Sequence, residues 1–343
     1  MLSEGSNKEK RALAWKPRFV KHLVVMKSPR LFVVVCLLTT AAAARGGDPD
    51  AVFAREIKTG ADTFEFKYHL KVPPLTNSAR LWIPAAHSDL FQAVEATPVS
   101  FPGLNAVAER DYGNRILFTE LKPDEGGKTI EASYQVTRKE KTPYPTADDP
   151  TPYLKPDRLV PLNETFATLA RSATAGKTTI MEKARALYDH TRTRMKYDKS
   201  GTGWGHGDAQ FACDARTGNC TDFHAYFIAL ARSIGIPARF AIGFTIPADK
   251  DEGLIAGYHC WAEFMADGRW VPVDISEASK NPELADYYFG HHPANRFEFT
   301  QGRDLRFEPA PAESPVNFLI YPLLEVNGSI VKTENEFSFR RLN

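Results

Sequence analysis

The first residue that could do chemistry is a cysteine at the start of a predicted helix. Cys220 follows a Gly-Asn turn, and the apolar residues after it recur at helical spacing until Gly235 ends the pattern. These apolar residues are Phe223, Phe227, Leu230 and Ile234. Free backbone N–H groups and the positive dipole end of a helix N-terminus stabilise a thiolate. The position therefore favours a nucleophilic cysteine over a buried structural one.

A predicted β-hairpin carries a histidine and an aspartate. Two alternating runs, 257–265 and 269–274, are joined by Asp-Gly, a pair typical of a tight turn. A four-residue loop would place His259 directly opposite Asp274, and a two-residue loop would make them diagonal neighbours on one face. A three-residue loop without a bulge would separate them. The hairpin thus permits an imidazole braced by a carboxylate, which a Cys–His nucleophile needs.

Each of these residues also has a structural interpretation. A histidine in a strand often serves packing, and Asp274 could cap the next helix through Ser276 and Glu277. Trp261 and Trp270 fit the core at least as well as a ligand site. The catalytic interpretation is favoured by the order of the residues along the chain. A cysteine at a helix start comes first, a histidine in a strand follows, and an aspartate lies on the next arm of the hairpin.

Three separated blocks of the sequence resemble the bacterial transglutaminase-like family. They are Gly218-Asn-Cys-Thr-Asp-Phe-His224 with Ala231-Arg-Ser-Ile-Gly-Ile-Pro-Ala-Arg239, His259-Cys-Trp-Ala-Glu263, and Trp270-Val-Pro-Val-Asp274. The resemblance covers about residues 180–280 and implies a papain-like core. It also implies that Cys220 is the nucleophile, His259 the base and Asp274 the residue that orients the base. Cys260 departs from the family pattern, which usually has alanine there, and Ile275-Ser276 replaces the usual Pro-Thr.

The resemblance implies a thioester on Cys220, formed from a glutamine side chain or a peptide amide and passed to water or an amine. The backbone N–H of Cys220 would stabilise the oxyanion with an upstream side chain, for which Gln210 and Trp204 are the candidates. We expect a protein or peptide substrate, no cofactor and no metal, because the adjacent His291 and His292 are poorly placed to chelate one ion. The alternatives are a papain-like protease or amidase, and a catalytically silent protein-binding module.

The composition argues against several other classes of protein. Of the 343 residues, 43% are hydrophobic and 25% are charged, as in ordinary globular proteins. Residues 1–45 hold nine of the 43 Lys and Arg and two of the 42 Asp and Glu, which leaves a net charge near −6 on the rest. A mildly acidic body argues against nucleic acid as the main partner.

Residues 1–45 have the organisation of an export signal with a long n-region. The basic segment 26–30 precedes the apolar run 31–38, and alanines at 41–44 offer a cleavage site. The stretch 31–44 is short for a bilayer span, so we expect no stable membrane insertion after cleavage. The sequence thus predicts a periplasmic or secreted protein, with an uncleaved N-terminal anchor as the alternative. Three cysteines would remain, and a Cys213–Cys220 or Cys213–Cys260 bond is left open.

The remaining chain predicts an α+β protein. Residues 46–141 are expected to form a β-rich N-terminal domain, an antiparallel sandwich, because apolar and polar residues alternate over 64–72 and 130–136. Shorter strands are expected over 80–84 and 116–121. Six prolines in 142–161 indicate a linker without regular structure.

A catalytic domain is expected over 162–310, with helices packed on an antiparallel sheet. Thr179 and Glu182 form a predicted capping box at the start of one of its helices. Residues 311–343 are expected to be a C-terminal extension.

Overall fold

The computed structural model describes residues 55–97, 99, 101 and 103–342, and these lie in one compact unit. The predicted export signal at 1–45 therefore lies outside the described residues. Within the described ranges, no helix has the length and apolar character needed to cross a membrane.

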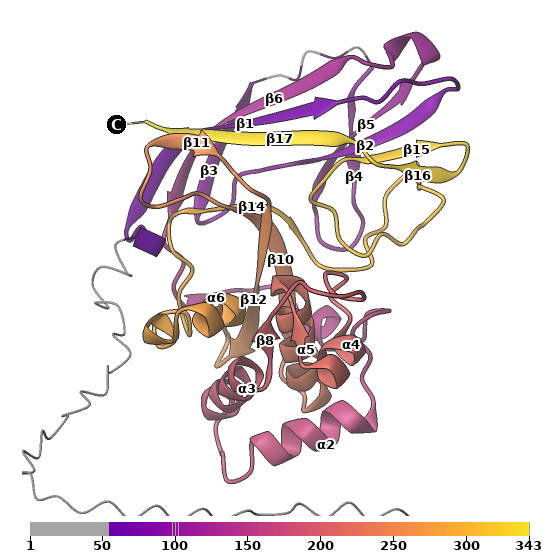
Figure 1. Ribbon diagram of the computed structural model, residues 1–343. Coiled ribbons are helices and arrows are strands. Elements are labelled where there is room, and N and C mark those ends of the chain that lie inside the picture. The colour runs from indigo at the N-terminus through magenta and orange to yellow at the C-terminus, as the bar shows by residue number, and fades with distance from the viewer. Residues whose placement is uncertain (1–54, 98, 100, 102, 343) are drawn as a thin grey trace, which may run out of the picture. The chain divides into compact units, whose positions relative to one another are not determined.

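Strands come from both ends of the chain, and most helices come from its middle (Figure 1). The α-helices are α2 (Glu164–Ala173), α3 (Ile180–Arg194), α4 (Ala209–Ala215), α5 (Cys220–Ser233) and α6 (Ile275–Lys280), and the 3-10 turns are η1 (Pro123–Glu125), η2 (Thr151–Leu154) and η3 (Pro282–Leu284). The strands are β1 (Ala61–Lys71), β2 (Ala79–Ala85), β3 (Gln92–Thr97), β4 (Asn105–Ala108), β5 (Arg115–Leu121), β6 (Thr129–Lys139), β7 (Tyr144–Pro145), β8 (Lys196–Tyr197), β9 (Thr217–Gly218), β10 (Ala238–Thr245), β11 (Glu252–Leu254), β12 (Tyr258–Ala266), β13 (Arg269–Val273), β14 (Arg296–Gln301), β15 (Leu323–Val326), β16 (Ser329–Val331) and β17 (Glu334–Arg341).

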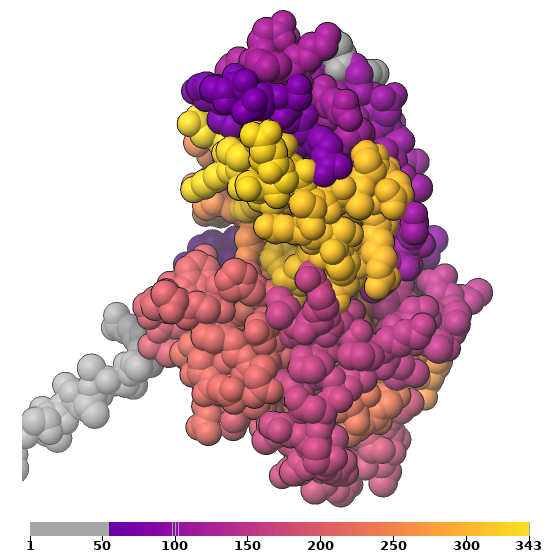
Figure 2. All heavy atoms as spheres, turned by 90° about the vertical axis from the view of Figure 1, so that its right-hand side faces the viewer, coloured from indigo at the N-terminus to yellow at the C-terminus, as the bar shows by residue number. Residues whose placement is uncertain are grey.

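The two ends of the chain share two five-stranded antiparallel sheets. Their strand orders are β11-β17-β1-β6-β3 and β16-β15-β2-β5-β4. On the face in Figure 2, the yellow C-terminal residues lie against the indigo N-terminal ones. Residues 311–343 therefore supply β15, β16 and β17 to the sheets of the N-terminal region instead of standing apart as an extension. The physical reason is that an exposed strand edge leaves backbone N–H and C=O groups without partners.

The alternating pattern predicted over 64–72 and 130–136 is confirmed. Along β1 and β6, every second side chain is buried. The ring of Phe66 on β1 lies 5.1 Å from that of Phe244 on β10 and 5.0 Å from that of Phe297 on β14, between centroids. The sheet that contains β1 is thus packed against a third sheet, which contains β10 and β14 and carries the candidate site.

Residues 142–161 are packed against that third sheet, although their prolines predicted a linker without regular structure. Tyr144 of β7 pairs with Trp270 of β13. The carboxylate of Asp157 accepts a hydrogen bond from Arg232 of α5 at 2.8 Å. Proline is compatible with such a strand, because β7 lies at the edge of its sheet.

The third sheet has the order β14-β10-β12-β13-β7, and α5 packs on it among the other helices. Nearly every residue of α5 is buried, so the helix forms the centre of this part of the core. The predicted helix starts are confirmed: α3 has Thr179 at its N-cap with Glu182 in a capping box, and α5 begins at Cys220. Helices packed on an antiparallel sheet are the arrangement expected for the catalytic region.

Candidate active site

The start of α5 is fixed by side-chain hydrogen bonds around Cys220. The N-cap residue Asn219 accepts from the backbone N–H of Thr221 at 2.9 Å, and its own N–H donates to the carboxylate of Asp222 at 2.9 Å. The same carboxylate accepts from the N–H groups of Gly205 and Gly207 and so ties down the preceding loop. Cys220 is held as the first helical residue, with 2% of its surface exposed.

The hairpin has the two-residue turn, so His259 and Asp274 are diagonal neighbours. Asp267 and Gly268 have φ of 49° and 71°, as a type I′ turn requires, and Ala262 pairs with Val273. With this register, Nε2 of His259 lies 2.6 Å from Oδ2 of Asp274. The structure therefore brings the predicted base and its orienting carboxylate together.

Asp274 also caps α6, so both interpretations of this residue hold at once. Its Oδ1 accepts from the backbone N–H of Glu277 and from the hydroxyl of Ser276, each at 3.1 Å. Its Oδ2 accepts from His259 and, at 3.2 Å, from the buried guanidinium of Arg296 on β14. The carboxylate is fully buried and every partner donates to it, which fixes its orientation.

Cys220 and His259 are hydrogen-bonded through their side chains. Because Asp274 occupies Nε2, the ring nitrogen left for the thiol is Nδ1. Cys220, His259 and Asp274 thus lie in the order that nucleophile, base and orienting acid require.

Charge at the site is redistributed by these contacts. Burial would raise the pKa of Asp274, but the charge and hydrogen bond of His259 and the charge of Arg296 hold it well below its usual value. Burial would lower the pKa of His259, but the adjacent Asp274 and Cys220 raise it to about 9. Burial would raise the pKa of Cys220, but hydrogen bonds from Cys260 and His259 lower it well below its usual value. Both shifts favour a thiolate beside an imidazolium.

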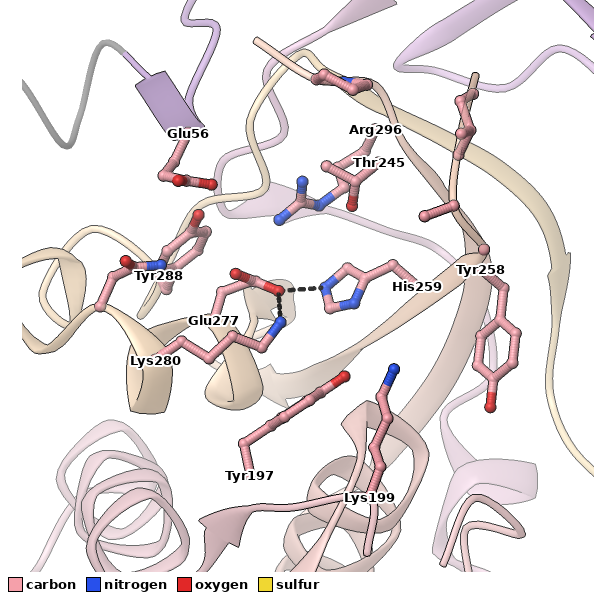
Figure 3. A pocket seen from close by; sticks show the side chains of 15 residues that line it. Glu56, Tyr197, Lys199, Thr245, Tyr258, His259, Glu277, Lys280, Tyr288 and Arg296 are labelled. Atoms are coloured by element: carbon pink, nitrogen blue, oxygen red, sulfur yellow. Dashed lines mark hydrogen bonds and ion pairs between the residues drawn. The ribbon is translucent and has the colours of Figure 1, made fainter. Parts of the chain in front are cut away.

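A cavity of about 480 Å³ opens beside His259 (Figure 3). Arg296 and Glu56 lie on one side of the imidazole, and Tyr197 and Lys199 lie on the other. Glu277 lies 3.7 Å from Nε2 of His259. Its carboxylate also pairs with Lys280 at 2.6 Å.

The two upstream side chains proposed for the oxyanion make other contacts. The amide of Gln210 donates to Asp214 on its own helix at 2.9 Å, and the indole N–H of Trp204 donates to the carbonyl of Gly201 at 3.2 Å. The backbone N–H of Cys220 has no hydrogen-bond acceptor among the described residues, as expected for the first N–H of a helix.

His224 and Arg296 were not predicted as site residues. His224 lies one turn after Cys220, so i,i+4 spacing within the quoted cysteine block could have found it. Arg296 carries no such signal, because it reaches Asp274 only through the strand order β14-β10-β12.

The three cysteines of the described residues are free and buried. Cys260, not Cys213, is the one whose thiol is hydrogen-bonded to Cys220. Cys213 lies on α4 and is hydrogen-bonded to Tyr226. Neither of the pairings left open for Cys213 is therefore formed in this structure.

Part of the chain matches a known protein family. Residues 167–275 match the model of the transglutaminase-like superfamily, and these residues include all three members of the candidate triad. Residues 167–275 are therefore a transglutaminase-like domain.

Its relatives include an uncharacterized protein of Haemophilus influenzae, 27% identical over 82% of this chain and 90% of the relative. A shorter match, 26% identical over 35% of this chain, is to 18% of the uncharacterized protein YebA of Bacillus subtilis. A solved structure of a candidate cysteine protease from Cytophaga hutchinsonii is 18% identical, has a TM-score of 0.56 and covers 83% of this chain and 92% of that one. At this identity the likeness concerns the fold alone, and it extends beyond the matched domain into the flanking sheets.

Proposed function

We propose that this protein is an exported thiol enzyme that hydrolyses amide bonds through a thioester on Cys220. The substrate would be a glutamine side chain or a peptide bond of a protein or peptide. His259 would protonate the leaving ammonia or amine, and water would then attack the thioester with His259 as base. No cofactor is needed for these steps.

One observation carries the proposal, namely the 2.6 Å hydrogen bond between Nε2 of His259 and Asp274. It holds the imidazole with Nδ1 directed to the thiol and raises the pKa of His259 to about 9, so that the ring can carry the proton it must deliver. A structural histidine would have no need of a buried carboxylate that is in turn oriented by Arg296.

The oxyanion would be stabilised by the backbone N–H of Cys220 and by the hydroxyl of Tyr258. The amide Nδ2 of Asn219 donates to this hydroxyl at 3.0 Å, so the phenol oxygen accepts and its own proton is free to be donated. Tyr258 interacts with Cys220 and lines the cavity. Removal of one such donor from an oxyanion hole typically costs about 10²-fold to 10³-fold in kcat.

Hydrolysis is favoured over transfer to an amine by the charges of the cavity. A site for a primary amine needs an unpaired carboxylate. After Asp274, which orients the base, the carboxylate nearest to His259 is Glu277, and it is already paired with Lys280. Besides His259, the cavity lining includes two carboxylate side chains, Glu56 and Glu277, and three basic side chains, Lys199, Lys280 and Arg296. Such a lining retains water, which an amine-transferring enzyme has to exclude from its thioester.

Export rests on the sequence of residues 1–45, with its basic segment, short apolar run and alanine-rich cleavage site. The alternative of an uncleaved anchor would keep the same catalytic region outside the cytoplasm. Sequencing the N-terminus of the mature protein distinguishes the two.

The reaction is tested by incubating the purified protein with a glutamine-containing protein and a labelled primary amine. We expect ammonia or new peptide N-termini, little incorporation of label, and loss of both products in Cys220→Ala. Cys213→Ala is the matched control, because this thiol is also buried and free but does not contact the triad. Efficient, Cys220-dependent incorporation of the label would establish a transglutaminase. No reaction, together with no labelling of Cys220 by a thiol-directed probe, would establish a silent binding module.

A further inference from the structure

The nucleophile has a second sulfur as its neighbour. Cys260 follows His259 on β12, so the two side chains leave the strand on opposite faces. Cys260 is fully buried, and its thiol is hydrogen-bonded to that of Cys220. The thiol of Cys220 therefore interacts with both His259 and Cys260.

The direction of each proton around Cys260 can be assigned from His224. The backbone N–H of Ile275 donates to Nε2 of His224 at 3.1 Å, so this nitrogen carries no proton. The proton of the neutral ring is therefore on Nδ1, which donates to the carbonyl oxygen of Cys220 at 2.7 Å. The same Nδ1 lies 3.6 Å from the sulfur of Cys260. Toward His224 the Cys260 sulfur can only accept, which leaves its S–H free to point at Cys220.

Of the two thiols, Cys220 is the one that ionises. It lies at the N-terminus of α5 and contacts His259, whose ring carries a proton at neutral pH. Cys260 lies within a strand, and its other polar neighbour is the neutral His224. Burial, together with the contact to Cys220, raises the pKa of Cys260 well above its usual value. Cys260 therefore remains a donor while Cys220 is an acceptor.

We propose that Cys260 is a positioning residue, whose S–H donates to the Cys220 thiolate and holds it beside His259. The chain of donors would run from the Ile275 N–H to His224, from His224 to the Cys220 carbonyl and the Cys260 sulfur, and from Cys260 to the thiolate. An alanine at this position would leave the thiolate with His259 as its single side-chain donor. The catalytic consequence rests on the proposed function, whereas the effect on the thiolate does not.

The test measures the thiolate without any substrate. Alkylation of the full chain by iodoacetamide is followed across pH on the Cys220 peptide by mass spectrometry, which separates it from the other cysteines. We expect Cys260→Ala to move the midpoint of alkylation to higher pH and to reduce the thiolate fraction below the midpoint about tenfold. Cys260→Ser should restore most of the difference, because its hydroxyl donates in the same place. Cys213→Ala should leave the midpoint unchanged.

Two further variants keep the test decisive. If Cys260→Ala does not fold, Cys260→Val fills the same space without a donor and should show the same shift. An unchanged midpoint in a folded Ala or Val variant, or a Ser variant that behaves like Ala, would overturn the proposal. Amide hydrolysis is measured separately: its absence from the wild-type protein would refute the proposed function and leave the alkylation result intact.

Discussion

Two histidines lie on either side of Asp274, and their environments give them opposite properties. Nε2 of His259 is 2.6 Å from Oδ2, and Nε2 of His224 is 3.8 Å from Oδ1. Both rings are buried. The pKa of His259 is raised to about 9, because Asp274 and Cys220 outweigh burial, whereas burial lowers the pKa of His224 and Asp274 does not compensate.

The difference teaches that the hydrogen bond, not distance to a charge alone, determines which imidazole can hold a proton next to Asp274. Nε2 of His224 accepts a hydrogen bond from the backbone N–H of Ile275. This nitrogen therefore carries no proton that it could donate to Asp274. Nε2 of His259 donates to the carboxylate instead. One ring can therefore exchange a proton during a reaction, while the other holds the backbone of the nucleophile in place.

The largest expected effect separates the two rings by activity. His259→Ala should lower kcat/KM of amide hydrolysis about 10⁴-fold, because it removes the base and proton donor. His224→Gln keeps one donor and one acceptor and should change kcat/KM by less than about tenfold. Steady-state kinetics on the two purified variants make the comparison, and equal losses would mean that the rings do not have separate roles.

Asp274→Asn should come next and should alter the pH profile. We expect kcat/KM to fall about 10³-fold to 10⁴-fold, because an amide does not stabilise the imidazolium. In the wild-type protein, activity should decline as pH rises through about 9, where His259 loses its proton. Without the carboxylate the pKa of His259 falls, so the decline in activity should begin at a lower pH. If the decline in activity at high pH occurs at the same pH in the variant, a group other than His259 causes it.

His224→Ala should affect stability more than chemistry. The change leaves the buried N–H of Ile275 without its acceptor and removes the side-chain donor to the carbonyl of Cys220, which should cost about 2 kcal/mol or more in free energy of unfolding. Urea denaturation monitored by circular dichroism gives the value. His224→Gln is the matched control and should recover part of the loss, whereas equal stability of the Ala variant and wild type would contradict the proton assignment.

Glu277→Gln should have the smallest effect. Its carboxylate lies 3.7 Å from Nε2 of His259, has a side chain 13% exposed and is paired with Lys280. We expect less than about a threefold change in kcat/KM, since a pair that solvent reaches contributes little. A loss comparable to that of Asp274→Asn, measured under the same conditions, would show that two carboxylates share the role of orienting His259.

The sequence alone was sufficient for the local parts of the site. Helical spacing after Cys220 predicted α5, and the Asp-Gly turn with the parity of its two arms left His259 and Asp274 on one face. These features depend on residues within one helix or one hairpin, so periodicity and turn chemistry suffice.

Tertiary structure decided everything that joins distant segments. β17 from the C-terminus pairs with β1, Arg296 reaches Asp274 across the sheet, and the thiol of Cys260 meets that of Cys220. Gln210 and Trp204, chosen for their place upstream of the cysteine, bond within their own segments instead. Sequence periodicity indicates which face of an element is buried. It does not indicate which other element covers that face, because the hydrophobic effect is non-directional.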